Sequence, residues 1–163
     1  MNKNMLAIIA TIQGLRTLES WPDSEAKRDL LSFKKHLESS EYDSDCPQNI
    51  RYADPLGNKI SIFEWSVSHE SVERHVRNCY MNGTIQVSTV WLGLNHSYFR
   101  DSMTIFETMI FGIDDDEELK GYQDRYSTLE AAEEGHEKAT GLVLEYLTKK
   151  NRKRGESCSF GWQ

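Results

Sequence analysis

The chain has 163 residues, enough for one domain with a hydrophobic core, and its 38% hydrophobic and 28% charged residues are ordinary for a globular protein. No apolar run approaches the length of about 18 residues that a membrane span requires. The amphipathic start of the chain lacks a small-residue cleavage site, which argues against a secretory signal. Three widely spaced cysteines, Cys46, Cys79 and Cys158, argue against a disulfide framework and for a reducing, intracellular setting.

The net charge of −7 is concentrated in one segment. Residues 114–137 contain ten acidic and two basic residues, a net −8, which leaves the rest of the chain nearly neutral. A basic run, residues 149–154, lies near the C-terminus. This run could contact nucleic acid, but it also continues a predicted helix and suits the negative end of the helix dipole, which we consider the better explanation.

Two amphipathic helices open the chain. Their apolar stripes are Met5, Ile8, Ile9, Ile12, Leu15 and Leu18 in the first, and Ala26, Leu30, Phe33 and Leu37 in the second. Trp21-Pro22 separates them, and Asp23 or Ser24 caps the second helix. The short connection predicts an antiparallel helical hairpin that forms a domain of residues 1–45. This hairpin could mediate a homodimer or self-assembly, and we expect residues 50–147 to fold without it.

The next segment predicts a turn and then a helix. Residues 50–53 could form a short strand, and Asp54–Asn58 has proline and glycine at turn positions. Ser61 and Glu64 form a capping box that predicts a helix from Ile62 to about Tyr80. The buried stripe of this helix would be Trp65, His69, Val72, Val76 and Cys79.

Residues 87–112 predict an antiparallel β-hairpin at the centre of the fold, entered through Asn82-Gly83. Apolar residues occupy both alternation phases of its strands, which is typical of strands covered on both faces. The predicted fold class is α+β, with a small antiparallel sheet centred on residues 84–112, packed helices and the N-terminal helical hairpin. We expect Trp65, Trp91 and Phe106 to be buried in one core.

An acidic loop follows Gly112, and a second capping box, Ser127 with Glu130, predicts a helix ending at about Lys150. The predicted apolar stripe of this helix is Leu129, Ala132, His136, Ala139, Val143 and Tyr146. Gly135 and Gly141 weaken it by about 1 kcal/mol each relative to alanine. This helix completes a core domain of residues 46–150, and residues 151–163 form a basic and aromatic tail.

Three blocks of sequence resemble a family of small bacteriophage and prophage proteins. The blocks are residues 87–96 (VSTVWLGLNH), 106–112 (FETMIFG) and 125–136 (RYSTLEAAEEGH). The similarity covers about residues 50–147, but residues 97–103 lack the glycines and prolines usual in the family, and Asn95 replaces its commoner aspartate. The resemblance implies a phage-encoded accessory protein in the host cytoplasm, and it implies no particular reaction.

His96, Glu107 and His136 are the candidates for chemistry. The hairpin and the following helix could bring them together, and two histidines with a carboxylate are the minimum for a metal site or an acid–base pair. The alternative is that each is structural, because His136 falls on an apolar stripe. His69-Glu70 resembles the start of a zinc-protease motif but lacks the second histidine. The sequence contains no phosphate-binding loop, no cysteine quartet and no nucleophile elbow, so we predict neither a cofactor nor a metal site.

The acidic segment suggests a different class of function. A dense negative surface can imitate the phosphate backbone and attract proteins whose basic channels hold nucleic acid. The predicted binding residues are Asp114, Asp115, Asp116, Glu117, Glu118, Glu130, Glu133, Glu134 and Glu137. The leading hypothesis is an inhibitor of a host protein, such as a nucleic-acid-handling defence enzyme. The alternatives are a small enzyme or nucleotide-binding protein, a structural module, and a merely solvated acidic loop.

Overall fold

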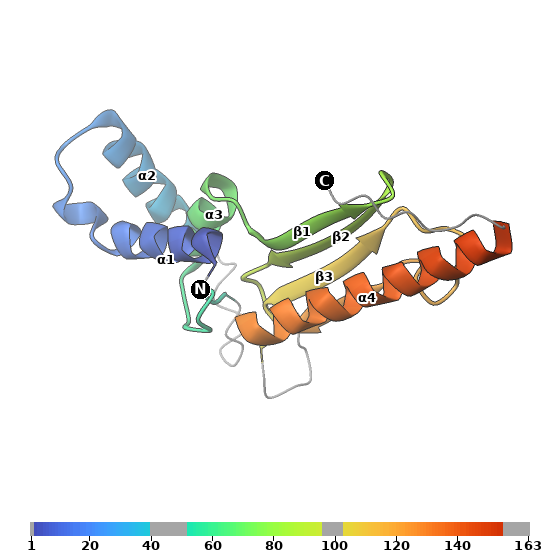
Figure 1. The fold of residues 1–163 in the computed structure, drawn as a ribbon. Coiled ribbons are helices and arrows are strands. Elements are labelled where there is room, and N and C mark those ends of the chain that lie inside the picture. The colour runs from blue at the N-terminus through green and yellow to red at the C-terminus, as the bar shows by residue number, and fades with distance from the viewer. Residues whose placement is uncertain (1, 40–51, 96–102, 155–163) are drawn as a thin grey trace.

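The structure is a computed structural model that describes residues 2–39, 52–95 and 103–154. Its elements are α1 (Lys3–Arg16), the 3-10 helix η1 (Leu18–Ser20), α2 (Glu25–Ser39), α3 (Ile62–Ser71), β1 (His75–Met81), β2 (Ile85–Trp91), β3 (Phe106–Phe111), β4 (Gln123–Tyr126) and α4 (Leu129–Arg154). The expected α+β fold class is confirmed. Helix α4 runs along one face of the sheet, and α1, α2 and α3 gather beyond one end of it (Figure 1).

The four strands form an antiparallel sheet in the order β1-β2-β3-β4. The central pair, β2 with β3, is the predicted hairpin, and Trp91 lies opposite Phe106 in its register. Part of the connection between these two strands, residues 96–102, lies outside the described residues. Of the short strand predicted at residues 50–53, residues 50 and 51 lie outside the described residues, and Tyr52 and Ala53 form isolated bridges with Leu94 and Lys59.

The predicted helix from Ile62 to about Tyr80 is wrong in its second half. Helix α3 ends at Ser71, and His75–Met81 forms the edge strand β1 paired with β2. Asn82 and Gly83 both have positive φ, 48° and 70°, so this pair makes the β1–β2 turn instead of ending a helix. The apolar residues between 72 and 79 fit either period, and hydrogen bonding to β2 decides for the strand.

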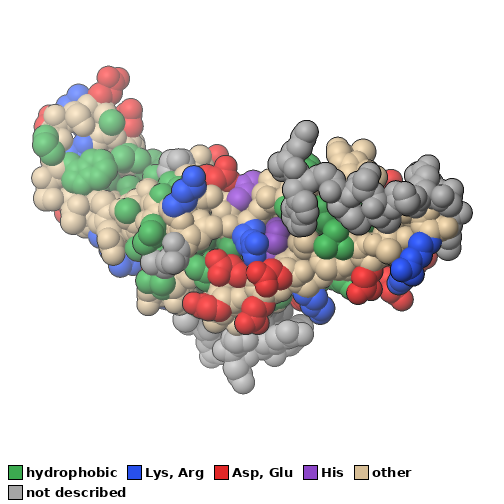
Figure 2. Space-filling view, in the orientation of Figure 1, with side chains coloured by type: hydrophobic (Ala, Val, Ile, Leu, Met, Phe, Trp, Pro, Cys, Tyr) green, Lys and Arg blue, Asp and Glu red, His purple; other side chains and the backbone are tan. Residues whose placement is uncertain are grey.

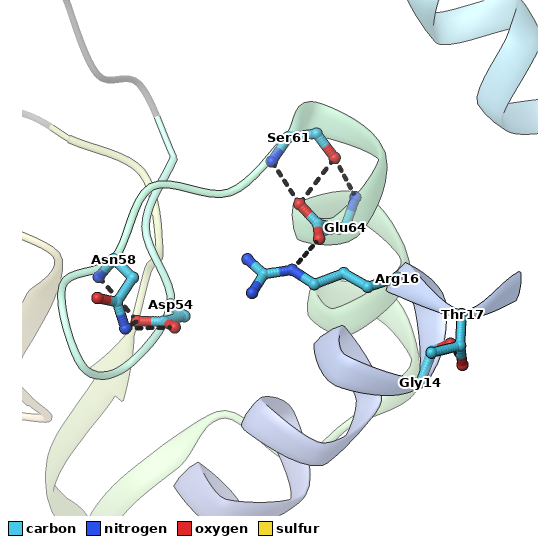
Figure 3. Close-up of polar contacts among 7 residues, drawn as sticks. All are labelled: Gly14, Arg16, Thr17, Asp54, Asn58, Ser61 and Glu64. Carbon is cyan, nitrogen blue, oxygen red and sulfur yellow. Dashed lines mark hydrogen bonds and ion pairs between the residues drawn. The ribbon is translucent and has the colours of Figure 1, made fainter.

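Two further local predictions need correction. The segment after Gly112 contains the short strand β4, which escaped prediction because its sequence, Gln-Asp-Arg-Tyr, is polar. At the start of α4 the hydroxyl of Thr128, and not that of Ser127, accepts the backbone N–H of Ala131 at 3.2 Å. The first capping box, by contrast, is confirmed: Ser61 and Glu64 bond each other reciprocally at the start of α3 (Figure 3).

Helix α4 covers the sheet with the stripe that its sequence predicts. Leu129, Ala132, His136, Ala139 and Val143 are buried, and Leu147 is buried in place of the half-buried Tyr146. Gly135 permits this close contact, because a Cβ there would lie 2.1 Å from the ring of Tyr126 on β4. The helix continues to Arg154 and therefore crosses the predicted domain boundary at residue 150.

The two glycines of α4 should respond to alanine in opposite ways. Gly141→Ala meets nothing within 4 Å, so we expect the free energy of unfolding to rise by up to about 1 kcal/mol. Gly135→Ala should lower it, because Tyr126 must move away from the sheet–helix contact. Urea unfolding of both variants measures the difference, and an equal gain in stability at both positions would contradict the packing described above.

Helices α1 and α2 form the expected N-terminal pair, and both pack against α3. Arg16 of α1 donates to the Glu64 carboxylate of α3 at 2.7 Å (Figure 3). The predicted separation of this pair from the core conflicts with the packing of α1. Its Met5, Ile8 and Ile12 are buried in the cluster that contains Trp91, Ile105 and Phe106, and Trp65 packs against this cluster half-buried. Trp91 and Phe106 are therefore buried in one core, as predicted, whereas Trp65 packs against that core without being fully buried.

Candidate functional site

A chain of polar side chains lies between α4 and the sheet. The Nδ1 atom of His136 is 2.8 Å from the hydroxyl of Thr89, which is 2.7 Å from the hydroxyl of Thr108. All three residues are buried. Thr89 alternates along β2 with the buried Val87 and Trp91, so its side chain points to the same face of the sheet. A polar residue at such a position was the feature of the sequence that could have predicted this cluster.

The other side of the imidazole faces a thiol. The Nε2 atom of His136 is 3.6 Å from Sγ of Cys79 on β1, and Sγ is 3.7 Å from the hydroxyl of Thr140. At the adjacent sheet edge, Arg77 donates to Glu137 at 2.9 Å. The sequence pattern predicted that Cys79 is on a buried face, but of a helix. The contact with His136 was not predicted, because Cys79 lies on a strand of the sheet.

Burial sets the protonation state of the cluster. It lowers the pKa of His136 to about 4, and the positive charge of Arg77 adds to this effect against the smaller opposing effect of Glu137. The imidazole is therefore neutral at neutral pH. Burial also raises the pKa of Tyr126 on β4, whose hydroxyl, like that of Tyr122, is buried without a hydrogen-bond partner in the described part of the chain.

The low pKa of His136 predicts acid sensitivity. The unfolded chain binds this proton near pH 6.5 and the native chain only near pH 4, so the unfolded state binds more protons between these values. The contribution of neutral His136 to the free energy of unfolding should be fully present above pH 6.5. The free energy of unfolding should then fall by up to about 3 kcal/mol as the pH drops toward 4. Urea unfolding across this range measures the slope. His136→Gln should flatten it, and an unchanged slope in that variant would contradict the assignment.

Glu107 lies on the opposite face of the sheet from His136. Successive side chains alternate along β3, so Thr108 points to α4 and Glu107 points away. The Glu107 carboxylate, nearly buried, accepts from Nε of Arg125 at 2.8 Å and from the side-chain amide of Gln123. The structure thus does not bring Glu107 and His136 together, and His96 lies outside the described residues. Each described member of the predicted trio already has partners within the fold.

His69 also has a structural environment. Its ring stacks on Trp65 with 4.7 Å between ring centroids, and Nε2 contacts the guanidinium of Arg74. Among the described residues, no group of three or more His, Cys, Asp or Glu side chains could hold a metal ion. No helix within those ranges is both long enough and apolar enough to cross a bilayer.

The predicted acidic binding residues divide into two groups along α4. Asp114, Asp115, Asp116, Glu117 and Glu118 belong to the β3–β4 loop, whereas Glu130, Glu133, Glu134 and Glu137 lie on the first half of α4. Asp115 joins its loop to the end of the helix, because its carboxylate accepts from the Tyr146 hydroxyl at 2.5 Å and from Lys150 at 2.8 Å. Figure 2 shows acidic side chains gathered near the beginning of α4 and again toward its end.

A groove of roughly 410 Å³ lies beside this loop, between the β1–β2 turn and the end of α4. Two of its charged groups, Asp115 and Lys150, pair with each other. Hydrogen bonds from Lys150 and Tyr146 lower the pKa of Asp115 to about 2, and the same contacts raise the pKa of Lys150. The hydrogen bonds among Asp115, Tyr146 and Lys150 hold the acidic loop against α4.

Comparison with protein-family models, curated proteins and solved structures finds no match for the chain.

Proposed function

We propose that this protein is a phage-encoded accessory protein that binds and inhibits a host protein through the acidic surface of α4 and the β3–β4 loop. The supporting observation is the number of uncompensated carboxylates. Of the nine acidic residues defined above, seven are exposed and two are half-buried. Within the described part of the chain, only Asp115 and Glu137 of the nine form ion pairs.

The dimensions of this surface suit an extended basic partner. Glu130 and Lys150 are 20 residues apart on one helix, which corresponds to about 30 Å, and the acidic loop is held at the far end by Lys150. Unpaired charges spread over such a length attract a positively charged channel and accelerate association. The proposed partner is a host enzyme that normally holds nucleic acid in a basic channel, in the host cytoplasm.

The rival proposal, an enzyme or nucleotide-binding protein, draws less support from the geometry. It requires His96, Glu107 and His136 in one pocket, whereas Glu107 and His136 point to opposite faces of the sheet. Self-association is a further candidate, favoured by Leu6, Trp21 and Phe33, which are exposed on the N-terminal helices and their connection. Sedimentation of the parent chain would distinguish a dimer from a monomer.

Charge removal tests the acidic surface. The acids changed to amides would be Asp114, Glu117, Glu118, Glu130, Glu133 and Glu134. Asp115 and Asp116 stay, because Asp115 anchors the loop and Asp116 accepts the backbone N–H groups of Glu118 and Leu119. We expect a lower association rate with a captured host partner and a weaker dependence on salt, with little change in stability.

A matched control removes six exposed acids from the other end of the molecule: Glu19, Asp23, Glu25, Asp29, Glu38 and Glu70. It changes the net charge equally but leaves the proposed surface intact. Equal losses in both variants would indicate a general charge effect. The rival proposal would be favoured by two results together: the chain without the six acids of the proposed surface inhibits the partner as well as the parent, and a folded Glu107→Gln or His136→Gln chain no longer inhibits it.

A further inference from the structure

The face of the sheet opposite α4 has no described helix packed across it. Helix α4 lies along the other face (Figure 1), where its buried side chains and those of α1 join Val87 and Trp91 in the two core clusters of the sheet. Side chains alternate along a strand, so the intervening residues of β2 point away from both helices. Apolar residues on both phases of the central strands predict that both faces are covered, and the described residues cover one of them.

The uncovered face is rich in the residue types that form the centres of interfaces. Tyr80, Gln86 and Phe111 make a row across β1, β2 and β3, because the register pairs Gln86 with both aromatic residues. Tyr80 is 68% exposed and Phe111 is 44% exposed. Val90 and Met109, both half-buried, continue the apolar surface along the same face. Aromatic residues and methionine are enriched in protein interfaces, so we name these five residues the open sheet face.

The open sheet face is also electrically neutral. The charged side chains that β2, β3 and β4 place beside it are Glu107 and Arg125, which form an ion pair with 2.8 Å between Oε2 and Nε. The chain as a whole has a net charge of −7, and its acidic surface on α4 and the β3–β4 loop lies on the other side of the sheet. Two copies that met through that acidic surface would repel each other, whereas the open sheet face lets them meet with their acids outward.

We propose that the open sheet face is a self-association surface, on which two copies of this chain pack face to face. A twofold axis that lies between the two sheets and runs along β2 places β1 of one copy over β3 of the other. Tyr80 of each copy then packs on Phe111 of the other copy, and Gln86 meets its own counterpart. This association does not depend on the proposed inhibition, and it would present one acidic surface on each outer side of the dimer.

The size of the open sheet face determines the expected affinity. A strand of seven residues is about 23 Å long and four strands span about 19 Å, so each copy offers roughly 400 Å². That is about half of what a standard interface buries from each partner. We therefore expect a weak dimer that forms at micromolar or higher protein concentrations.

Analytical ultracentrifugation of the full chain measures this association. Between about 10 and 500 µM we expect the average mass to rise from the monomer value of 18.9 kDa toward twice that value. Added salt should leave the dissociation constant unchanged or lower it, because the interface is neutral and salt screens the repulsion between acidic surfaces. A chain that stays monomeric throughout, or a dimer that salt dissociates, would overturn the proposal.

A charge exchange tests whether Tyr80 meets Phe111. The variants are Tyr80→Lys and Phe111→Glu, and each removes both aromatic contacts from its own dimer. An equimolar mixture keeps one aromatic contact and gains one Lys–Glu pair, so it should associate at least about tenfold more tightly than either variant alone. A mixture that associates no better than its components would contradict the face-to-face arrangement.

The matched control introduces the same two charges on the N-terminal helices. Leu6→Lys and Phe33→Glu replace apolar side chains that are 47% and 40% exposed, and we expect neither to change the dissociation constant. Loss of the dimer in these variants, with the dimer intact in Tyr80→Lys, would place self-association on α1 and α2 and overturn the proposal.

A monomeric parent would leave two other occupants for the open sheet face, which thermal melts separate. A fall of about 5 °C or more in the melting temperature of monomeric Tyr80→Lys would show that another segment of the same chain covers the face. An unchanged melting temperature would indicate a different protein, and either result overturns the proposal. If a variant fails to fold, the concentration and salt dependence of the parent chain still decide the outcome.

Discussion

Trp91→Ala should lower the free energy of unfolding by about 3–5 kcal/mol, a large fraction of the total stability of a small domain. Trp91 has no exposed surface and packs against α1, α4 and β3 in the main core. Its indole N–H also donates to the backbone oxygen of Ala53 at 3.2 Å, so truncation leaves a cavity and an unpaired carbonyl. Urea unfolding followed by circular dichroism measures the loss.

Trp21→Ala is the matched control for this change. Trp21 follows η1 in the chain, its side chain lies beside Gly14 at the end of α1 and is 37% exposed, and its indole N–H makes only a long contact, 3.3 Å, with Thr17. We expect a loss of less than about 1 kcal/mol there. Equal losses in the two variants, or an unchanged melting temperature for Trp91→Ala, would show that the core is assigned wrongly.

Removal of residues 1–45 should abolish cooperative unfolding and leave an aggregating chain. The deletion takes Met5, Ile8 and Ile12 out of the core that holds Trp91 and Phe106. It also removes the side-chain amide of Asn4, which donates to the carbonyl of His75 at 2.8 Å and so covers part of the β1 edge. An exposed edge strand beside an uncovered apolar surface favours aggregation.

Two substitutions in α1 refine the same test without deleting the helix. Ile8 has no exposed surface, so Ile8→Ala should cost about 2–5 kcal/mol. Leu6 lies on the same helix with 47% of its surface exposed, so Leu6→Ala should cost little. A cooperatively folding chain of residues 46–163, with a melting temperature close to that of the parent, would restore the original expectation of an independent core.

Part of the charge distribution on α4 also follows from helix electrostatics. Glu130 lies in the first turn and the basic run 149–154 lies in the last turns, which is the arrangement that the helix dipole favours. This local effect accounts for Glu130 but not for Glu133, Glu134 and Glu137, nor for the five consecutive acids of the β3–β4 loop. The loop is therefore the part of the proposed binding surface that lies outside the helix, and its variants carry most weight in the charge experiment.

The sequence by itself determined the elements whose signals are local. The capping box of Ser61 and Glu64 begins α3, Pro22 separates α1 from α2, and the buried stripe of α4 follows from its 3.6-residue period. The central pair β2–β3 was also predictable, because β-branched and aromatic residues fill both of its strands. These patterns depend on residues within a few positions of one another, so they establish the α+β class without knowledge of the neighbours.

Only the tertiary structure decided the rest, because those features depend on partners distant along the chain. Residues 75–81 have an apolar spacing that suits a helix or a strand, and pairing with β2 selects the strand. Tertiary packing likewise joins α1 to the core and separates Glu107 from His136 across the sheet. The ring nitrogens of His136 contact Cys79 on β1 and Thr89 on β2. Of these two residues, Thr89 is nearer in the sequence, and it is 47 residues away. No local pattern encodes that distance, so the thiol–imidazole contact becomes visible only when the sheet and α4 are assembled.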